Sequence, residues 1–227
     1  MSTKIIATLG PSSSSAKIIK SMFEAGMDIA RINTKYGTQK EYSKLLEILT
    51  KQKCKVLFDI KGFLMLPWLK DKKFDYLAVS FAESADQIEG IRVFFGRKIK
   101  IIAKIETRKG FNHIDELIRA SDGIMVARGD LGKNLRIEEV PIYQKLIIKE
   151  CNKKKKFVVT ATEMLLSMTD SKIPVRAEVS DVANAVLDGS NAVMLSEETA
   201  IGHHPTLVVR TMNSIVKETE KKRRLLK

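Results

Sequence analysis

An ammonium and two carboxylates follow two neighbouring apolar segments of the sequence. Lys104 and Glu106 lie at the exit of the apolar run 99–105, and Asp130 follows the apolar run 123–127. If both runs are strands of one parallel sheet, their carboxyl ends meet at the same edge. A divalent metal ion beside an anionic substrate needs this combination of charges. The spacing therefore predicts a metal-assisted active site in this stretch.

Glu106 and Asp130 are the predicted metal ligands. Two carboxylates, with the other positions left to water and substrate oxygens, are typical of Mg2+ or Mn2+ sites. Zinc is disfavoured because the two cysteines and three histidines form no ligand cluster in the sequence. The structural alternative is a salt-bridge network with Lys104 or Arg128.

Further polar residues suit an anionic substrate. Lys104 is expected to face an oxyanion or a transferring phosphoryl group, whose charge an ammonium stabilises. Arg31 can bind phosphate through two parallel hydrogen bonds. The backbone N–H groups of residues 129–132, near a helix N-terminus, can hold a carboxylate. Thr162 can bond the same carboxylate or help to deliver a proton.

Eight short apolar segments alternate with helical or short connecting segments. Helices are expected at 110–120 and 137–154, among others, and at most one or two helical turns at 63–72. This alternation predicts a parallel sheet with helical crossovers. No glycine-rich dinucleotide fingerprint follows the first strand, so a closed (β/α)8 TIM barrel is favoured over an open sheet. Residues 1–227 are expected to form this single barrel domain. The predicted strands are residues 4–9, 27–32, 55–58, 76–79, 99–105, 123–127, 157–160 and 192–195.

Polar side chains lie at or just after the carboxyl ends of seven of the eight predicted strands, all but the first. In a barrel of this kind the active site lies at the carboxyl ends of the strands. The sequence therefore predicts one site that collects these side chains: Arg31, Asn33, Asp59, Ser80, Lys104, Glu106, Asp130, Thr162 and Ser196.

The composition bears on location and partners. No run of 18 apolar residues is present and the amino terminus lacks a long apolar stretch, so we expect a cytoplasmic protein without a membrane span. Cys54 and Cys151 are expected to be unpaired thiols. The formal net charge of +13 is compatible with nucleic-acid binding. That function is not favoured, because the lysines are scattered and the runs 153–156 and 221–224 contain no aromatic residues.

Nine segments, in order along residues 3–202, form a recognisable set of motifs. They are TKIIATLGPSS, EAGMDIARIN, FDIKG, DYLAVSF, IIAKIE, ASDGIMVARGDLG, ATEMLLSM, RAEVSDVANAVLDG and AVMLSEETAIG. With these segments the sequence resembles the barrel domain of the pyruvate kinase family from Thr3 to Gly202. That resemblance implies a TIM barrel of the phosphoenolpyruvate/pyruvate type. It also implies transfer of a phosphoryl group from phosphoenolpyruvate to ADP, with Mg2+ and usually K+.

The resemblance also implies roles for individual residues. Lys104 would face the phosphoryl group and the enolate, and Arg31 would lie on the phosphate side. Glu106 and Asp130 would hold Mg2+. The remaining implied roles are Gly129, Asp130 and Thr162 around the substrate carboxylate, Pro11 towards the nucleotide, and Asn33 and Asp59 as ligands of the monovalent cation.

The sequence departs from the family pattern beside the third strand. Lys61 and Gly62 are followed within a few residues by Pro67, which leaves no room for the lid domain that the family inserts there. Leu66 occupies the position of an arginine that helps phosphoryl transfer in the family. We also expect no C-terminal regulatory domain, and hence no allosteric sugar-phosphate site of the family type.

The monovalent-cation site is altered as well. Lys35 replaces a serine ligand and Ile60 replaces a threonine ligand, which argues against a requirement for K+. We expect the Lys35 ammonium to occupy the K+ position, paired with Asp59; the alternative is that Lys35 points to solvent. Glu163 and Glu197 replace the usual glutamine and glycine.

Three functions are compatible with these residues. The first is a pyruvate kinase-type phosphotransferase, weakened by the missing lid. The second is a lidless Mg2+-dependent enolate enzyme of the oxaloacetate decarboxylase, aldolase or lyase type. The third is a non-catalytic subunit that binds phosphoenolpyruvate or a nucleotide. A homodimer is compatible with the resemblance.

Overall fold

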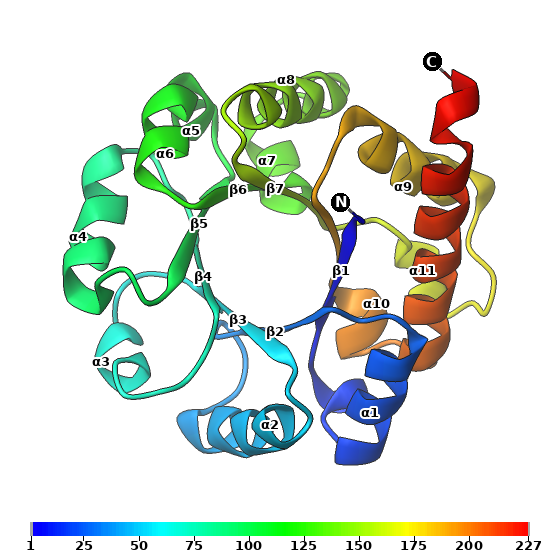
Figure 1. Cartoon of the computed structure of the whole chain (residues 1–227), viewed down its shortest axis with the longest axis horizontal. Helices are drawn as coiled ribbons and strands as arrows, with labels where there is room; N and C mark the ends of the chain where they lie inside the picture. The colour runs from blue at the N-terminus through cyan, green and yellow to red at the C-terminus, as the bar shows by residue number, and fades with distance from the viewer. Residues whose placement is uncertain (1, 227) are drawn as a thin grey trace.

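Eight parallel strands close into a barrel in the order in which they occur in the chain (Figure 1). The computed structural model describes residues 2–226, except for the side chains at 224 and 226. β1 pairs with both β2 and β8, so the sheet closes on itself and no strand edge is left open. The strands are β1 (Lys4–Thr8), β2 (Ile29–Asn33), β3 (Lys55–Ile60), β4 (Tyr76–Val79), β5 (Lys100–Ile105), β6 (Gly123–Ala127), β7 (Phe157–Ala161) and β8 (Ala192–Leu195).

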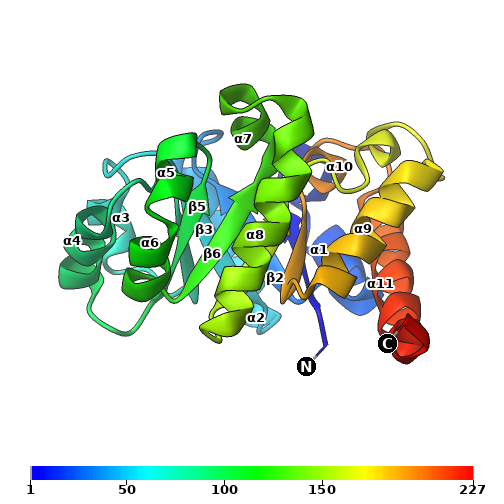
Figure 2. The same ribbon diagram turned by 90° about the horizontal axis from the view of Figure 1, so that it is seen from above.

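Helices surround the barrel on its outer side, which confirms the predicted (β/α)8 fold (Figures 1 and 2). None of the described helices has the length and hydropathy that crossing a bilayer requires. The α-helices are α1 (Ala16–Ala25), α2 (Gln39–Lys51), α3 (Leu66–Leu69), α4 (Ala85–Phe95), α5 (Arg108–Asn112), α6 (Ile114–Ala120), α7 (Arg128–Asn134), α8 (Val140–Lys153), α9 (Arg176–Asp188), α10 (Glu197–Ala200) and α11 (Pro205–Lys222). The 3-10 helices are η1 (Pro11–Ser13), η2 (Ile137–Glu139), η3 (Leu166–Thr169) and η4 (Arg223–Leu226).

Two predicted helices differ in detail from the structure. The helix expected at 110–120 is divided into α5 and α6 at His113, whose ring Nδ1 lies 2.7 Å from the carbonyl oxygen of Glu83. The helix expected at 137–154 begins with a 3-10 turn, η2, before α8. Both differences lie at helix ends, where a 3-10 turn or a shift of a boundary by a few residues is common.

Side-chain alternation along the strands creates two cores. Successive residues of a strand point to opposite faces of the sheet. On β5, Ile101, Ala103 and Ile105 pack outward against the helices, while Ile102 belongs to a smaller apolar cluster inside the barrel. Lys104 shares the inward face with Ile102. The interior is therefore apolar in its middle and becomes polar towards the end at which the strands finish.

A repeated hydrogen bond fixes the other end of the barrel. An Asp or Asn immediately precedes each even-numbered strand, and its side-chain oxygen accepts the N–H of the second residue of the preceding strand. The N···O distances are 2.8–2.9 Å. These bonds satisfy backbone donors at strand beginnings and join the strands in pairs. The four acceptor–donor pairs are Asp28 with Ile5, Asp75 with Val56, Asp122 with Ile101, and Asn191 with Val158.

Replacing one of these acceptors should destabilise the barrel. Asp75→Ala leaves the N–H of Val56 without its acceptor, and we expect the free energy of unfolding to fall by about 1–3 kcal/mol. Asp75→Asn keeps a side-chain oxygen at this position and should cost clearly less. Urea-induced unfolding of both variants measures the difference. Equal losses in the free energy of unfolding of the two variants would show that this hydrogen bond does not stabilise the barrel.

Candidate active site

The predicted site residues lie at the end of the barrel at which the strands finish. Alternation places Lys104 and Glu106 on the same face of β5 as Ile102, one layer after another towards this end. Lys104 is 7% exposed and Glu106 is 1% exposed. α5, α7 and α10 lie at the same end, whereas both chain termini lie at the opposite end (Figure 2). The structure thus gathers the polar residues that follow the strands.

Lys104 is the centre of a buried charge network. Its Nζ lies 3.0 Å from Asp59 Oδ1, from Ser80 Oγ and from Glu106 Oε1. These three contacts use all three donors of the ammonium. A substrate oxygen can reach Lys104 only by replacing one of these partners. Ser80 is the neutral one, so its contact is exchanged at the lowest electrostatic cost.

Asp59 joins Lys104 to Arg31. The guanidinium of Arg31 donates to Asp59 Oδ2 from Nε at 3.0 Å and from NH2 at 2.8 Å. A third donor, NH1, reaches the hydroxyl of Thr8 at 2.8 Å. An arginine has five N–H donors, so two remain for a phosphate. Asp59 thereby compensates two cations that the barrel has taken out of water.

The two carboxylates of the network have opposite pKa shifts. Burial alone would raise the pKa of Asp59, but the positive charges of Lys104 and Arg31 outweigh it and hold the pKa below the ordinary value. Burial raises the pKa of Glu106, and the opposing effects of Lys104 and of the Phe81 N–H are smaller. Asp59 is therefore ionised at neutral pH. Glu106 holds its charge less firmly and gains most from an added cation.

Asn134 links the backbone of Glu106 to that of Asp130 on α7. The side-chain amide of Asn134 donates to the backbone carbonyl oxygen of Glu106 at 3.1 Å and to that of Asp130 at 2.9 Å. Asp130 Oδ1 pairs with Lys133, which lowers the pKa of this carboxyl. Within residues 2–226, no three acidic, histidine or cysteine side chains form a complete metal cluster. Glu106 and Asp130 offer carboxylate oxygens, the ligand type of a hydrated hard cation such as Mg2+, whose other ligands are water and substrate oxygens.

A strained turn at the end of β7 carries Thr162. Thr162 and Glu163 have φ angles of 72° and 52°, in the left-handed region that a β-branched residue rarely adopts. Arg128 holds this turn, because its guanidinium donates to the carbonyl oxygens of both residues. Thr162 Oγ1 accepts the N–H of Gly129 at 2.7 Å. Thr162 and Gly129 thus lie together, as expected, and are bonded to each other.

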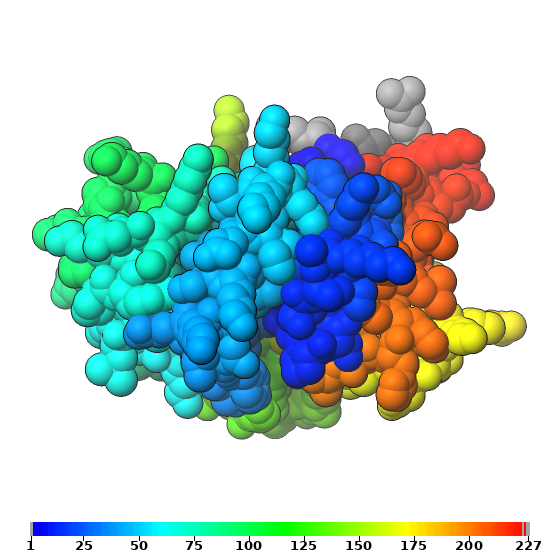
Figure 3. Space-filling model, turned by 90° about the horizontal axis from the view of Figure 1, so that it is seen from below, coloured from blue at the N-terminus to red at the C-terminus, as the bar shows by residue number. Residues whose placement is uncertain are grey.

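The residues expected near the nucleotide line one cleft. A cavity of about 790 Å³ opens between the segments that follow β1, β2 and β8, and Pro11, Arg31 and Asn33 are among its lining residues. The side chains of α2 form part of its wall. Figure 3 shows the side of the molecule on which α1 and α2 lie next to each other. Glu197 also lines the cleft and is exposed, which places a negative charge in it.

The structure does not bring Lys35 to Asp59. Lys35 is exposed, and its ammonium lies 5.2 Å from the ring centroid of Tyr36. Both oxygens of Asp59 are engaged by Arg31 and Lys104 in the part of the chain that the structure describes. Asn33 Oδ1 accepts the N–H of Lys35 at 3.1 Å. The expected Lys35–Asp59 pair is therefore not formed, because the carboxylate already has two cationic partners.

The segment that follows β3 does not form a cover over the active site. Phe63 and Leu64 are 51% and 93% exposed. Leu66, by contrast, is 8% exposed and packs in the core between barrel and helices. A side chain that could reach a phosphate is thus replaced by one that stabilises the fold. Nothing in residues 61–65 shields the carboxyl end of the barrel from water.

Three residues of the site were absent from the predicted set of functional residues or had no assigned role there. Thr8 and Ser80 contact Arg31 and Lys104 directly. Both lie at the end of a strand, and the rule that predicted Ser80 could also have found Thr8. Asn134 links Glu106 to Asp130 through its position on the last turn of α7. No sequence signal distinguishes it from an ordinary surface asparagine.

Comparison with known proteins agrees with this geometry. The family model for "Pyruvate kinase, barrel domain" matches residues 1–65 and 64–209. The pyruvate kinase of Thermococcus litoralis is 32% identical over 336 aligned residues, which cover 99% of this chain and 71% of the relative. Those of Geobacillus stearothermophilus and Trypanoplasma borreli are 46% and 49% identical over 76% and 70% of this chain.

The extent of these matches shows where a relative contains a segment that this chain lacks. The alignment with the Thermococcus litoralis protein has 336 positions, more than the 227 residues of this chain, so that relative carries a long insertion. The two matched parts of the family model meet at residues 64–65. This is the exposed segment after β3. The matches to the other two proteins span 28% and 32% of their lengths.

Removing the charge of Asp59 should destabilise the protein strongly. Asp59→Asn leaves the buried Arg31 without its anion and Lys104 with Glu106 alone, and we expect a loss of about 3–5 kcal/mol in the free energy of unfolding at neutral pH. Asp59 has a lowered pKa, so its contribution is complete above the ordinary value of 3.8 and disappears as the pH falls through the lower folded value. The difference between wild type and variant should therefore narrow below pH 3.8.

Asp28→Asn is the matched control for this prediction. It keeps an acceptor for the Ile5 N–H and removes only a partly exposed pair with Lys4, so it should cost at most about 1 kcal/mol. Denaturant unfolding over a range of pH compares the two variants. A loss as small for Asp59→Asn as for Asp28→Asn would contradict the central role of Asp59.

Proposed function

The chain belongs to the pyruvate kinase family, and from this premise we propose that its barrel binds phosphoenolpyruvate or pyruvate and transfers a phosphoryl group between phosphoenolpyruvate and ADP. The observation that carries the proposal is the buried ammonium of Lys104, held between Asp59 and Glu106 at the carboxyl end of the barrel. A fixed positive charge in a dry site stabilises an oxyanion far more than it would in water.

Lys104 would stabilise the enolate oxygen. When the bond between this oxygen and phosphorus breaks, the phosphoryl group passes to a terminal oxygen of ADP and negative charge develops on the enolate. The ammonium exchanges its contact with Ser80 for this oxygen and keeps its carboxylate partners, which hold it in position. The enolate then takes a proton at its methylene carbon and becomes pyruvate.

Arg31 would orient the transferring phosphoryl group. Its contacts with Asp59 and Thr8 fix the plane of the guanidinium, and its two remaining N–H donors suit a phosphate. Arg31 lines the same cleft as Pro11 and Asn33. The cleft is therefore the place proposed for the nucleotide.

Glu106 and Asp130 would hold the divalent cation, Mg2+ or Mn2+, since both supply the carboxylate oxygens that such a cation prefers. When bound, this cation would neutralise charge on the substrate oxygens. The substrate carboxylate would lie against Gly129 and Thr162, where it has to share or replace the bond between them. Thr162 would also assist proton delivery through its hydroxyl.

Transfer to ADP is the weaker part of this function. Phosphoryl transfer depends on positioning and on exclusion of water. Leu66 contributes no charge to the site, and Glu197 adds a negative one to the cleft. These observations favour, as a second candidate, a lidless enzyme that uses the same Lys104 and cation to form the enolate of pyruvate. A subunit that only binds phosphoenolpyruvate or nucleotide is the remaining candidate.

Proton exchange and ATP formation, measured on the same preparations, test the proposal. With Mg2+ in deuterated water, the methyl proton signal of pyruvate should disappear, and ATP should form from phosphoenolpyruvate and ADP. Lys104→Met should slow both reactions about 100- to 1000-fold, because it removes the charge opposite the enolate. Lys109→Met, which removes an exposed lysine on α5, should leave both rates unchanged.

The two signals separate the three candidates. Proton exchange without ATP formation would replace the phosphotransferase by the enolate enzyme. Binding of oxalate or phosphoenolpyruvate without either reaction would leave the non-catalytic subunit. Equal effects of the Lys104 and Lys109 variants would contradict the proposed role of Lys104.

Proton exchange of pyruvate should not require K+. Lys35 and Ile60 provide no oxygen ligands in their side chains, and Asp59 is already bound to two cations, so we expect the same exchange rate in the presence and absence of K+. The double variant Lys35→Ser/Ile60→Thr restores the ligand types of the family and should make the rate respond to K+. A strong K+ dependence of the unaltered protein would overturn this prediction.

A further inference from the structure

Positive charge gathers at the end of the barrel opposite the active site. In a parallel barrel every loop from a helix to the next strand lies at the end where the strands begin; we refer to this end as the amino-terminal face. Lysines that are scattered in the sequence are thereby brought to one surface. The loops before β3, β5 and β7 contain residues 51–55, 97–100 and 153–156, which together hold ten lysines and arginines and no acidic residue.

Most of this charge is exposed and uncompensated. The basic side chains of residues 51–55 and 97–100 are all exposed. Within residues 2–226, none of them forms an ion pair of 4.0 Å or less. Only Lys153 and Lys154 of the third segment do so, with Glu150 and Asp115. A surface of this kind attracts polyanions at long range.

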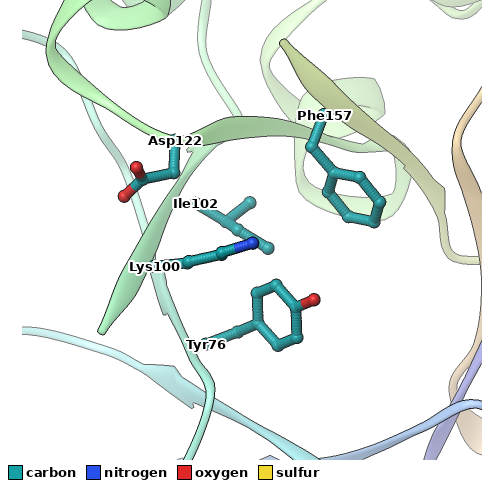
Figure 4. A pocket seen from close by; sticks show the side chains of 5 residues that line it. All are labelled: Tyr76, Lys100, Ile102, Asp122 and Phe157. Carbon is teal, nitrogen blue, oxygen red and sulfur yellow. The ribbon is translucent and has the colours of Figure 1, made fainter. Parts of the chain in front are cut away.

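A ring-sized pocket lies within this basic face (Figure 4). Tyr76 and Phe157 begin β4 and β7, and their rings are nearly parallel, at 21°, with centroids 6.2 Å apart. Ile102 lines the pocket from the interior of the barrel, and Lys100 extends beside the aromatic rings with its Nζ 6.0 Å from the Tyr76 centroid. The pocket volume is about 160 Å³. An apolar cavity of roughly 150 Å³ is large enough for one benzene ring.

The rim of the pocket combines charge with aromatic surface. Lys55 and Lys100 begin β3 and β5, and alternation places them on the same strand faces as the interior residues Leu57 and Ile102. Asp122 is the acidic residue that lines the pocket, and its Oδ2 is engaged by Arg92 and by the N–H of Ile101. Positive charge therefore dominates the rim.

We propose that the amino-terminal face binds single-stranded nucleic acid, with one base against Tyr76 and Phe157 and the phosphates on the surrounding lysines. Basic surfaces with stacking aromatic side chains bind single strands without strong sequence preference. A lipid bilayer presents anionic charge but no flat ring to enter the pocket. A double helix keeps its bases stacked and cannot supply one either. This site is independent of the function proposed for the opposite end of the barrel.

Fluorescence anisotropy with a labelled oligothymidylate of about 12 nucleotides tests the proposal. We expect binding that weakens as salt rises, with a linear dependence of log K on log salt concentration. An abasic oligonucleotide with the same number of phosphates should bind about 5- to 100-fold more weakly with a similar salt slope, because only the stacking is lost. Phe157→Leu should abolish this preference for bases.

Charge on the face is tested by neutralisation of exposed lysines. Lys55, Lys98 and Lys100 changed to Gln should reduce the magnitude of the salt slope by about 2 and weaken binding roughly 100-fold at ~100 mM salt. The matched control is the change of Lys17, Lys40 and Lys109 to Gln. These lysines are exposed and lie in the first turns of α1, α2 and α5, at the opposite end of the barrel. Both triple variants have the same net charge. This control should bind as the unaltered protein does.

Several outcomes would overturn the proposal. They are absence of binding, equal losses in the two lysine variants, equal affinity for the abasic oligonucleotide, or binding of phosphatidylserine vesicles in preference to the oligonucleotide. If Phe157→Leu does not fold, the abasic comparison on the unaltered protein still decides the question. Lys104→Met should keep oligonucleotide binding, so a failure of the proposed enolate chemistry leaves this result unaffected.

Discussion

The buried contacts of Asp59 are the interaction on which the active end of this barrel depends. Two cations, Lys104 and Arg31, lie inside a closed sheet where neither could remain charged without a counter-ion. Asp59 supplies that counter-ion from the strand between them in chain order, and a lowered pKa keeps it ionised. Glu106 belongs to the same network, and burial raises its pKa, so it carries the less firmly held charge, which suits a group that would accept a metal ion.

Alternation of side chains and parallel topology together divide the barrel into two chemically different ends. The inward faces of the strands are apolar in the middle of the barrel, and this apolar layer separates the polar groups at one end from those at the other. At the end where strands finish, charges are buried and paired. At the end where strands begin, Asp28, Asp75, Asp122 and Asn191 bond backbone N–H groups, while the lysines around them remain exposed to solvent. The same fold rule therefore produces buried, paired charges at one end and an open electrostatic surface at the other.

Much of this arrangement could be predicted from the sequence, because it depends on local rules. Apolar runs bounded by turns gave the strands, and the position of Lys104, Glu106 and Asp59 relative to strand ends gave their meeting point. Contacts between distant segments could not be predicted in this way. The break at His113 depends on the Glu83 carbonyl, and the role of Asn134 depends on two carbonyl oxygens that only the fold brings together. Lys35 was expected to pair with Asp59, but Arg31 and Lys104 already occupy this carboxylate, and Lys35 is exposed. The basic surface could not be predicted for the same reason, since its lysines come from loops that are far apart in the chain.

The departures from the family pattern are not distributed evenly over the active end. Lys35, Ile60, Leu66 and Glu197 belong to the segments around β2, β3 and β8, and two of these segments form the cleft proposed for the nucleotide. On the other side, Lys104, Glu106, Asp130 and Thr162 are the residue types that the family resemblance implies there, and hydrogen bonds join Thr162 to Gly129 and Asn134 to the backbone of Glu106 and Asp130. Enolate stabilisation needs only that second group, whereas transfer to ADP also needs the first group and protection from water. The substitutions therefore bear on the choice of phosphoryl acceptor and leave intact the residues that would hold pyruvate and its enolate.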